Sequence, residues 1–204
     1  MNETAYKLMN IRLLVNLMHI EPPIWRRILV PYGITLAQLH DVIQAAMGWE
    51  NSHLHEFRID GNRYGVPDEG FEDPSSRVHP EDDVRLHDVL DHKEQTFTYV
   101  YDFGDDWHHE LVVEEILETE SDRCEAYCLD GARNCPPEDI GGPFNYPEIL
   151  TALSDPKHEG HDHYTEWMGD DFDPEAFDPV SINNKLEFLA AHWRTLSDKS
   201  SRLH

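Results

Sequence analysis

Alternating apolar and polar residues predict a β-hairpin in the middle of the chain. From Thr96 to Phe103 every second residue is aromatic, and after Gly104 the alternation resumes and runs to Leu117, as a side-chain period of two requires. The intervening Phe103-Gly-Asp-Asp106 is expected to connect the strands, with Gly104 taking the backbone conformation that other residues avoid.

A second hairpin is predicted near the N-terminus. Leu8 to Met18 and Ile24 to Val30 are rich in aliphatic residues, and Pro22-Pro23 between them marks a bend because proline donates no ladder hydrogen bond. His53 to Ile59 is expected to form a short strand. Gly61 to Asp83 is acidic and rich in glycine and proline, which predicts a long surface loop.

The clearest helix signal starts at Thr35. Thr35-Leu-Ala-Gln38 has the pattern of a capping box, apolar residues then recur at helical spacing, and Gly48 supplies a C-terminal signal. Further helical segments are predicted at Leu86 to Leu90, at Tyr146 to Leu153 and in a C-terminal helix capped by Ser181.

These elements predict an α+β fold, in which a mainly antiparallel sheet built from the two hairpins carries helices packed on it and a C-terminal helix. The stretch from Cys124 to Pro143, dense in cysteine, proline and glycine, is expected to be irregular. The length suits one domain, residues 1–198, followed by a disordered tail at residues 199–204.

The charge balance narrows the possible partners. The chain holds 16 Lys and Arg against 41 Asp and Glu, a net charge of −25. Nucleic acid is disfavoured as a partner because binding a polyanion requires clustered basic residues. An anionic membrane surface is disfavoured for the same reason. A protein or a cationic small molecule fits this balance better.

No apolar run approaches the length of a membrane span, and the first residues lack the pattern of a secretion signal. The odd number of cysteines, Cys124, Cys128 and Cys135, favours reduced thiols over a disulfide framework. A cytoplasmic location is therefore expected. The three thiols could also ligate zinc, although their spacing is not that of a zinc ribbon.

The connection of the central hairpin is the strongest candidate for chemistry. Asp102, Asp105 and His109 could ligate a divalent metal such as zinc, or form a carboxylate and imidazole pair for proton transfer. His53 and His55 would lie about 6.5 Å apart on one face of a strand and could join the same ion. The alternative is turn chemistry, because aspartate favours such corners by bonding nearby backbone N–H groups.

Another histidine-rich segment follows the predicted helix at 146–153. It contains His158, His161 and His163 close to Trp167, and it could chelate a metal or simply form solvated surface.

Several motifs together resemble one known family, the plasmid pRiA4b ORF-three-like proteins, a prokaryotic group without an assigned function. The resemblance covers about Lys7 to Leu189 and rests on Pro23-Ile-Trp-Arg-Arg27, Thr35-Leu-x2-Leu-His40 with Met47-Gly-Trp49, His53-Leu-His-x-Phe57, Tyr101-Asp-Phe-Gly-Asp-x-Trp-x-His109, Cys128-Leu-x-Gly131 with Cys135-Pro-Pro-Glu-Asp-x-Gly-Gly142, and Trp167 with Phe172-Asp-Pro-Glu175. It implies a shared domain rather than a reaction.

Two functional hypotheses follow. The first is a non-catalytic binding or adaptor protein whose acidic cleft is edged by aromatic side chains, with Trp49, Tyr101, Trp107 and Trp167 as the ligand-binding residues. The second is a metal-dependent hydrolase that uses the Asp and His cluster of the central hairpin. Stoichiometric bound metal distinguishes the second hypothesis from the first.

Overall fold

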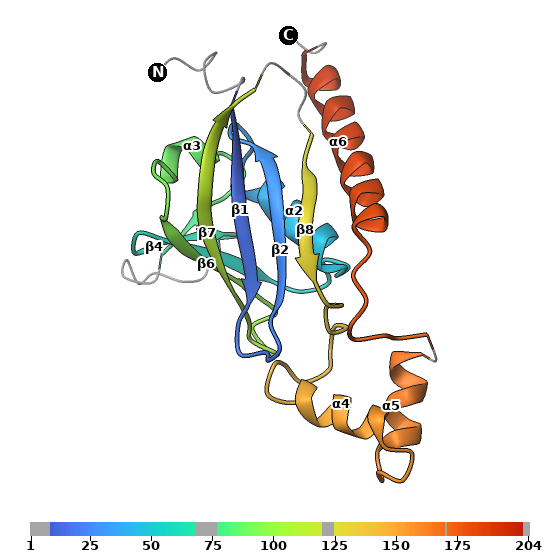
Figure 1. The fold of residues 1–204 in the computed structure, drawn as a ribbon. Helices are drawn as coiled ribbons and strands as arrows, with labels where there is room; N and C mark the ends of the chain where they lie inside the picture. Colours follow the sequence, from blue (N-terminus) through green and yellow to red (C-terminus); the bar gives the residue numbers. More distant parts are fainter. Residues whose placement is uncertain (1–8, 68–76, 120–124, 170, 202–204) are drawn as a thin grey trace.

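An eight-stranded sheet forms the body of the protein (Figure 1). The structure is a computed structural model, and it describes residues 9–67, 77–119, 125–169 and 171–201. In sequence order the strands are β1 (Met9–Leu17), β2 (Ile24–Pro31), β3 (His55–Ile59), β4 (Asn62–Gly65), β5 (Val78–Pro80), β6 (Thr96–Tyr101), β7 (Trp107–Glu118) and β8 (Tyr127–Ala132). Their order across the sheet is β5-β4-β3-β6-β7-β1-β2-β8.

Both predicted hairpins are present and lie side by side at the centre of the sheet. β1 pairs with β2 and β6 pairs with β7, and the two hairpins are joined by antiparallel pairing of β1 with β7. Every strand pair is antiparallel except β4 with β5. The α+β prediction with a mainly antiparallel sheet is confirmed.

Five helices complete the described part of the chain: α2 (Leu36–Met47), α3 (Leu86–Val89), α4 (Tyr146–Ser154), α5 (His161–Met168) and α6 (Pro179–Ser201). α2 has the predicted capping box at Thr35, and Gly48 ends it with a φ of 92°. The apolar face of α2 packs into the core, where Leu36, Leu39 and Val42 are fully buried. α6 contacts both α2 and β8.

The two segments expected to be loops contain short strands. β4 and β5 lie within Gly61 to Asp83, whose residues 68–76 are outside the described ranges, and β8 lies within Cys124 to Pro143. The sequence of β8 does not alternate, because this strand is at the edge of the sheet and buries few of its side chains. It is held by β2, a partner about a hundred residues earlier, as in the pair Trp25 and Ala132.

Three local predictions also need correction. In the central turn Asp102 and Asp106 adopt positive φ values, 54° and 59°, whereas Gly104 does not. Asp178 rather than Ser181 caps α6, because its carboxylate accepts hydrogen bonds from the backbone of residues 180 and 181 at 3.0 Å each. α6 continues to Ser201, into the segment expected to be a tail, and residues 202–204 lie outside the described part.

The β1–β2 and β6–β7 connections lie at one end of the sheet, and α4 and α5 lie beyond that end (Figure 1). The chain that leads from β8 to α4 passes next to the β6–β7 connection. Of the helices in the described ranges, none has both the length and the hydrophobicity that a bilayer crossing requires.

Candidate metal centre

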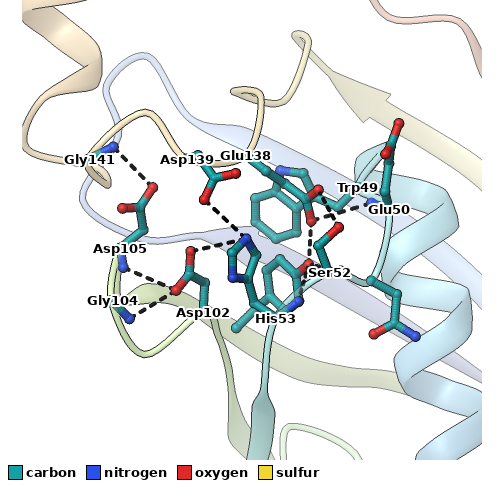
Figure 2. A network of polar contacts seen from close by, with 12 residues as sticks. Trp49, Glu50, Ser52, His53, Asp102, Gly104, Asp105, Glu138, Asp139 and Gly141 are labelled. Atoms are coloured by element: carbon teal, nitrogen blue, oxygen red, sulfur yellow. Dashed lines mark hydrogen bonds and ion pairs between the residues drawn. The ribbon is translucent and has the colours of Figure 1, made fainter.

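Three segments distant in sequence meet at the end of the sheet and bring His53, Asp102 and Asp139 together (Figure 2). His53 precedes β3, Asp102 begins the turn between β6 and β7, and Asp139 belongs to the loop that follows β8. The Nε2 atom of His53 lies 3.2 Å from Oδ1 of Asp139 and 3.7 Å from Oδ2 of Asp102. The three possible ligand atoms all lie within 4.8 Å of one another.

The turn orients Asp102 through backbone hydrogen bonds. Its amide donates to the carbonyl of Leu54 at 2.9 Å, which ties the turn to the segment that carries His53. Its Oδ1 accepts from the amides of Gly104 at 2.9 Å and Asp105 at 3.3 Å, the local bonding that aspartate provides in turns. Oδ2 is therefore the oxygen that faces His53 (Figure 2).

A close backbone contact holds the loop of residues 138–142 on this turn. Oδ2 of Asp105 accepts a hydrogen bond from the amide of Gly141 at 3.0 Å. Gly142 has a φ of 79°, and a Cβ atom at this position would lie 2.2 Å from the carbonyl oxygen of Asp105. The loop reaches this position only because residue 142 has no side chain, and in this position it places Asp139 beside His53.

Tyr101 fixes the position of the segment that carries His53 through hydrogen bonds. Its hydroxyl accepts from the amides of Ser52 at 2.9 Å and His53 at 3.3 Å and donates to the carboxylate of Glu138. Burial raises the pKa of Tyr101, and the bond to Glu138 raises it further. The phenol therefore remains a proton donor to Glu138 across the physiological range.

The Nε2 atom of His53 is buried and makes no hydrogen bond of good geometry within the described residues, although two carboxylate oxygens lie within 4 Å. Two arrangements satisfy this atom. In the first, a protonated His53 forms an ion pair with Asp102 and Asp139. In the second, a neutral His53 and both carboxylates share one metal ion, and ligands at about 2.0–2.2 Å from a metal lie roughly 3–3.5 Å from one another.

The remaining predicted metal ligands lie elsewhere. Asp105 is adjacent to the site, but its carboxylate accepts a hydrogen bond from the amide of Gly141. His55 faces a different environment, where its Nε2 lies 2.9 Å from each oxygen of Glu81 and its ring stacks on His40 at 3.5 Å. The expectation that His53 and His55 share one face is not met, because β3 starts only at His55 and the alternation does not extend to His53.

His109 is also separated from the site. It is fully buried in β7, next to the rings of Trp49 and Tyr99. Burial lowers the pKa of His109 to about 3, so the imidazole is neutral in the folded protein at any ordinary pH. The alternation of β7 points residues 107 and 109 into the core, and for this reason His109 does not reach the turn.

Three of the four aromatic residues predicted to bind a ligand form an internal stack. The ring of Trp49 lies 5.0 Å from that of Tyr101 and 5.8 Å from that of Trp107. Tyr101 and Trp107 are fully buried and Trp49 is 7 % exposed, whereas Trp167 on α5 is 48 % exposed. The four side chains therefore do not edge one cleft: three belong to the core and Trp167 to a separate helix.

The cysteines and the second histidine cluster do not form a metal site in the described part of the chain. Cys128 and Cys135 are free and buried, and burial raises the pKa of Cys135 to about 12. Cys124 lies outside the described residues. His158 pairs with Glu148 and His161 bonds the carbonyl of Ala152. Within the described residues, one group of three or more possible ligands converges, the one that contains His53.

Sequence reasoning did not include Asp139 in the site. The available signal was the motif Glu138-Asp-Ile-Gly-Gly142, in which two adjacent glycines follow two acids, as in a loop that approaches another backbone closely. Composition alone could not indicate which backbone it approaches.

The protein is thus an α+β protein with a single open sheet and a histidine–carboxylate cluster at one end of that sheet. The chain belongs to the family described as plasmid pRiA4b ORF-3-like protein, whose match covers residues 9–181. This confirms the resemblance inferred from the motifs.

Two similar proteins carry descriptions that assign no function. "Uncharacterized protein y4hQ" of Sinorhizobium fredii (strain NBRC 101917 / NGR234) is 42% identical over 187 residues, which cover 90% of this chain and 93% of that protein. The protein of unknown function MM3350 from Methanosarcina mazei Go1 is 37% identical in sequence to this chain, and its crystal structure superposes with a TM-score of 0.74. The match covers 84% of this chain and 96% of that chain.

Proposed function

We propose that this protein is a metal-binding domain that holds one divalent transition-metal ion between His53, Asp102 and Asp139. The observation that carries the proposal is the convergence of one imidazole nitrogen and two carboxylate oxygens on a common point, with the nitrogen buried and without a hydrogen bond among the described residues. The three residues come from three different segments that the fold brings together.

The ligand set favours particular metals. Imidazole with carboxylate suits zinc, manganese, iron or cobalt, whereas magnesium and calcium prefer oxygen ligands alone. Three protein ligands leave coordination positions open for water or a ligand, as in metal sites that bind small molecules or carry out reactions.

The charges around the site also favour a bound cation. No lysine or arginine occurs in residues 50–57, 99–117 or 134–156. Carboxylates on the sheet are neutralised differently: Arg27 donates to Glu114 at 2.8 Å and lowers its pKa. Within the described residues, Asp102 and Asp139 have no arginine or lysine partner, and the group beside them that can carry a positive charge is His53.

A hydrolase remains the second candidate, and the open coordination positions are what favour it. Its metal ligands would be His53, Asp102 and Asp139 in place of Asp102, Asp105 and His109. A metal held by His53, Asp102 and Asp139 would supply Lewis acidity, and Glu138, which lies next to Asp139 (Figure 2), would be a nearby carboxylate able to act as a general base. A binding role without a reaction requires only the metal, and for that reason it is the leading proposal.

A cytoplasmic location is part of the same proposal, supported by the two buried free thiols. The acidic charge balance supports a protein or a cationic small molecule as partner rather than nucleic acid.

The metal proposal is tested with untagged protein stripped of metal by a chelator. Titration with Co²⁺, followed by visible absorbance, and equilibrium dialysis with Zn²⁺ are expected to give one ion per chain. His53→Gln and Asp139→Asn are each expected to weaken binding at least about tenfold, because each removes one of three ligands. Equal affinity in the wild type and both variants would exclude this site.

The matched control is His108→Gln. His108 lies close to the same turn and pairs with Asp106 at 2.9 Å, so its replacement removes an imidazole near a carboxylate without touching the three ligands. Its metal affinity should equal that of the wild type.

Unfolding measurements distinguish the metal site from a simple ion pair. Bound metal at a free concentration of about 100 times its Kd stabilises the folded state by about 2.7 kcal/mol. An ion pair alone predicts no stabilisation by metal in the wild type, together with a loss of stability in metal-free His53→Gln.

A further inference from the structure

A groove between α2 and α6 lies outside the candidate metal centre. Its volume is about 560 Å³, within the range of about 300–1,000 Å³ that small-molecule sites occupy. One wall comes from α2 and the residues that follow it, and the other comes from α6. The lining residues used below are Asp41, Ala45, Trp49, Glu50, Lys185 and Phe188.

The α6 wall presents an aromatic side chain to solvent. Phe188 is 76 % exposed, whereas the buried face of the same helix, marked by Leu186 and Trp193, packs against the rest of the protein. Phe188 is thus not required for the packing of α6. Covering an exposed phenylalanine removes apolar surface from water, which favours an apolar group in the groove.

The α2 wall adds negative charge. Asp41 is partly buried, and within the described residues its carboxylate accepts a hydrogen bond from the indole of Trp193 at a long 3.4 Å. Burial raises the pKa of Asp41, as expected for a carboxylate that has lost water without gaining strong donors. Glu50 adds a second carboxylate on this wall.

Lys185 is the one basic residue among those that line the groove. Within the described ranges it makes no ion pair, so it does not neutralise Asp41. Two carboxylates against one ammonium leave the groove negative, on a chain whose net charge is −25.

We propose that the α2–α6 groove binds a small organic cation with an aromatic or branched apolar body. The ammonium or amidinium group lies against Asp41, where it supplies the donor and the charge that this carboxylate lacks, and the apolar body covers Phe188 and Ala45. Trp49, which was predicted from the sequence to bind a ligand, lines this groove and not the metal centre. The proposal does not depend on the metal.

Three probes of nearly equal shape and different charge test the proposal: 1-naphthylmethylammonium, 1-naphthylacetamide and 1-naphthylacetate. Affinities are measured by titration monitored with amide NMR, which also locates the contact. The cation should bind at least about tenfold more tightly than the anion, with the neutral probe between them, and the shifted amides should lie on α2 and α6.

Variants assign the effect to named residues. Asp41→Asn keeps an acceptor for Trp193 but removes the charge, and it should reduce the cation preference to less than about threefold. Phe188→Ala should weaken the binding of all three probes by a similar factor, and Lys185→Gln should strengthen the binding of the cationic probe. Glu187→Gln, next to Phe188 but absent from the groove lining, is the control and should change nothing.

An anion that binds as tightly as the cation, or a cation preference that survives in folded Asp41→Asn, would overturn the proposal. The proposal would also be overturned if the amide chemical-shift changes caused by the cationic probe were unchanged in Phe188→Ala, because the probe would then be responding to the general acidity of the surface. Should Asp41→Asn fail to fold, Glu50→Gln gives the same test on an exposed residue, with a smaller expected loss of preference.

Discussion

Replacing Gly142 with alanine tests how the candidate metal centre is assembled. The neighbouring Gly141 provides a matched control, since the two glycines have nearly equal φ values, 83° and 79°. A Cβ atom at position 141 would lie 3.4 Å from its nearest neighbour, Nδ2 of Asn145, whereas at position 142 it would lie 2.2 Å from the carbonyl oxygen of Asp105. The two variants share the backbone penalty and differ in the clash.

The expected magnitudes follow from this difference. An alanine in the left-handed region costs about 1–2 kcal/mol, and Gly141→Ala should lose that much free energy of unfolding. In Gly142→Ala the loop must also move away from a backbone atom, and forced displacement of this kind costs roughly 1–3 kcal/mol more. The total expected loss is therefore about 2–5 kcal/mol.

Urea unfolding of the two variants in metal-free buffer measures both losses. Metal affinity gives a second readout, because a displaced loop carries Asp139 away from His53: Gly142→Ala should bind metal at least about tenfold more weakly than Gly141→Ala. Equal stability and equal metal affinity in the two variants would refute the argument that this contact sets the position of Asp139.

Three further predictions concern the rest of the fold. Burial lowers the pKa of His40 and of His109 from 6.5 to about 3. Between pH 6.5 and pH 3 the unfolded chain therefore binds more protons than the folded protein, and the free energy of unfolding falls as the pH falls, by up to about 1.4 kcal/mol per pH unit for each histidine. A free energy of unfolding that is constant from pH 6.5 to 5 would contradict this. Thr35→Ala removes the capping box of α2 and should cost about 1 kcal/mol in urea unfolding, while Thr35→Ser should retain most of it. Cys128 and Cys135 should resist alkylation in the native protein and react only after unfolding, as read by peptide mass spectrometry, because burial raises the pKa of both thiols.

The elements that were predicted correctly are those whose signals are local. The capping box at Thr35 and the C-terminal Gly48 lie within one helix, and the alternation of β6 and β7 spans one hairpin with a short connection. In each case the residues that specify the structure are close together in the chain, so the pattern is readable without knowledge of the rest of the fold.

Among the elements that were missed, β8 depends on a distant partner, whereas β4 pairs with its neighbour β3 across Asp60 and Gly61. β8 has little alternation of its own and forms against β2, and β4 and β5 pair in parallel within a segment whose composition indicates a loop. The hairpin turn was correctly placed, but the positive φ values fall on Asp102 and Asp106. Asp102 is held in that conformation by bonds to its own turn and to Leu54.

The candidate site shows the same division. The sequence by itself determined the fold class, the family and the region around Asp102 as the candidate site, since these depend on composition, periodicity and motifs. Only the tertiary structure decided the ligand set, because His53, Asp102 and Asp139 lie in segments about 40–50 residues apart. In the tertiary structure His109 is buried in the core and His55 pairs with Glu81. Asp139 lies beside His53 because of a backbone contact that only a glycine at position 142 permits.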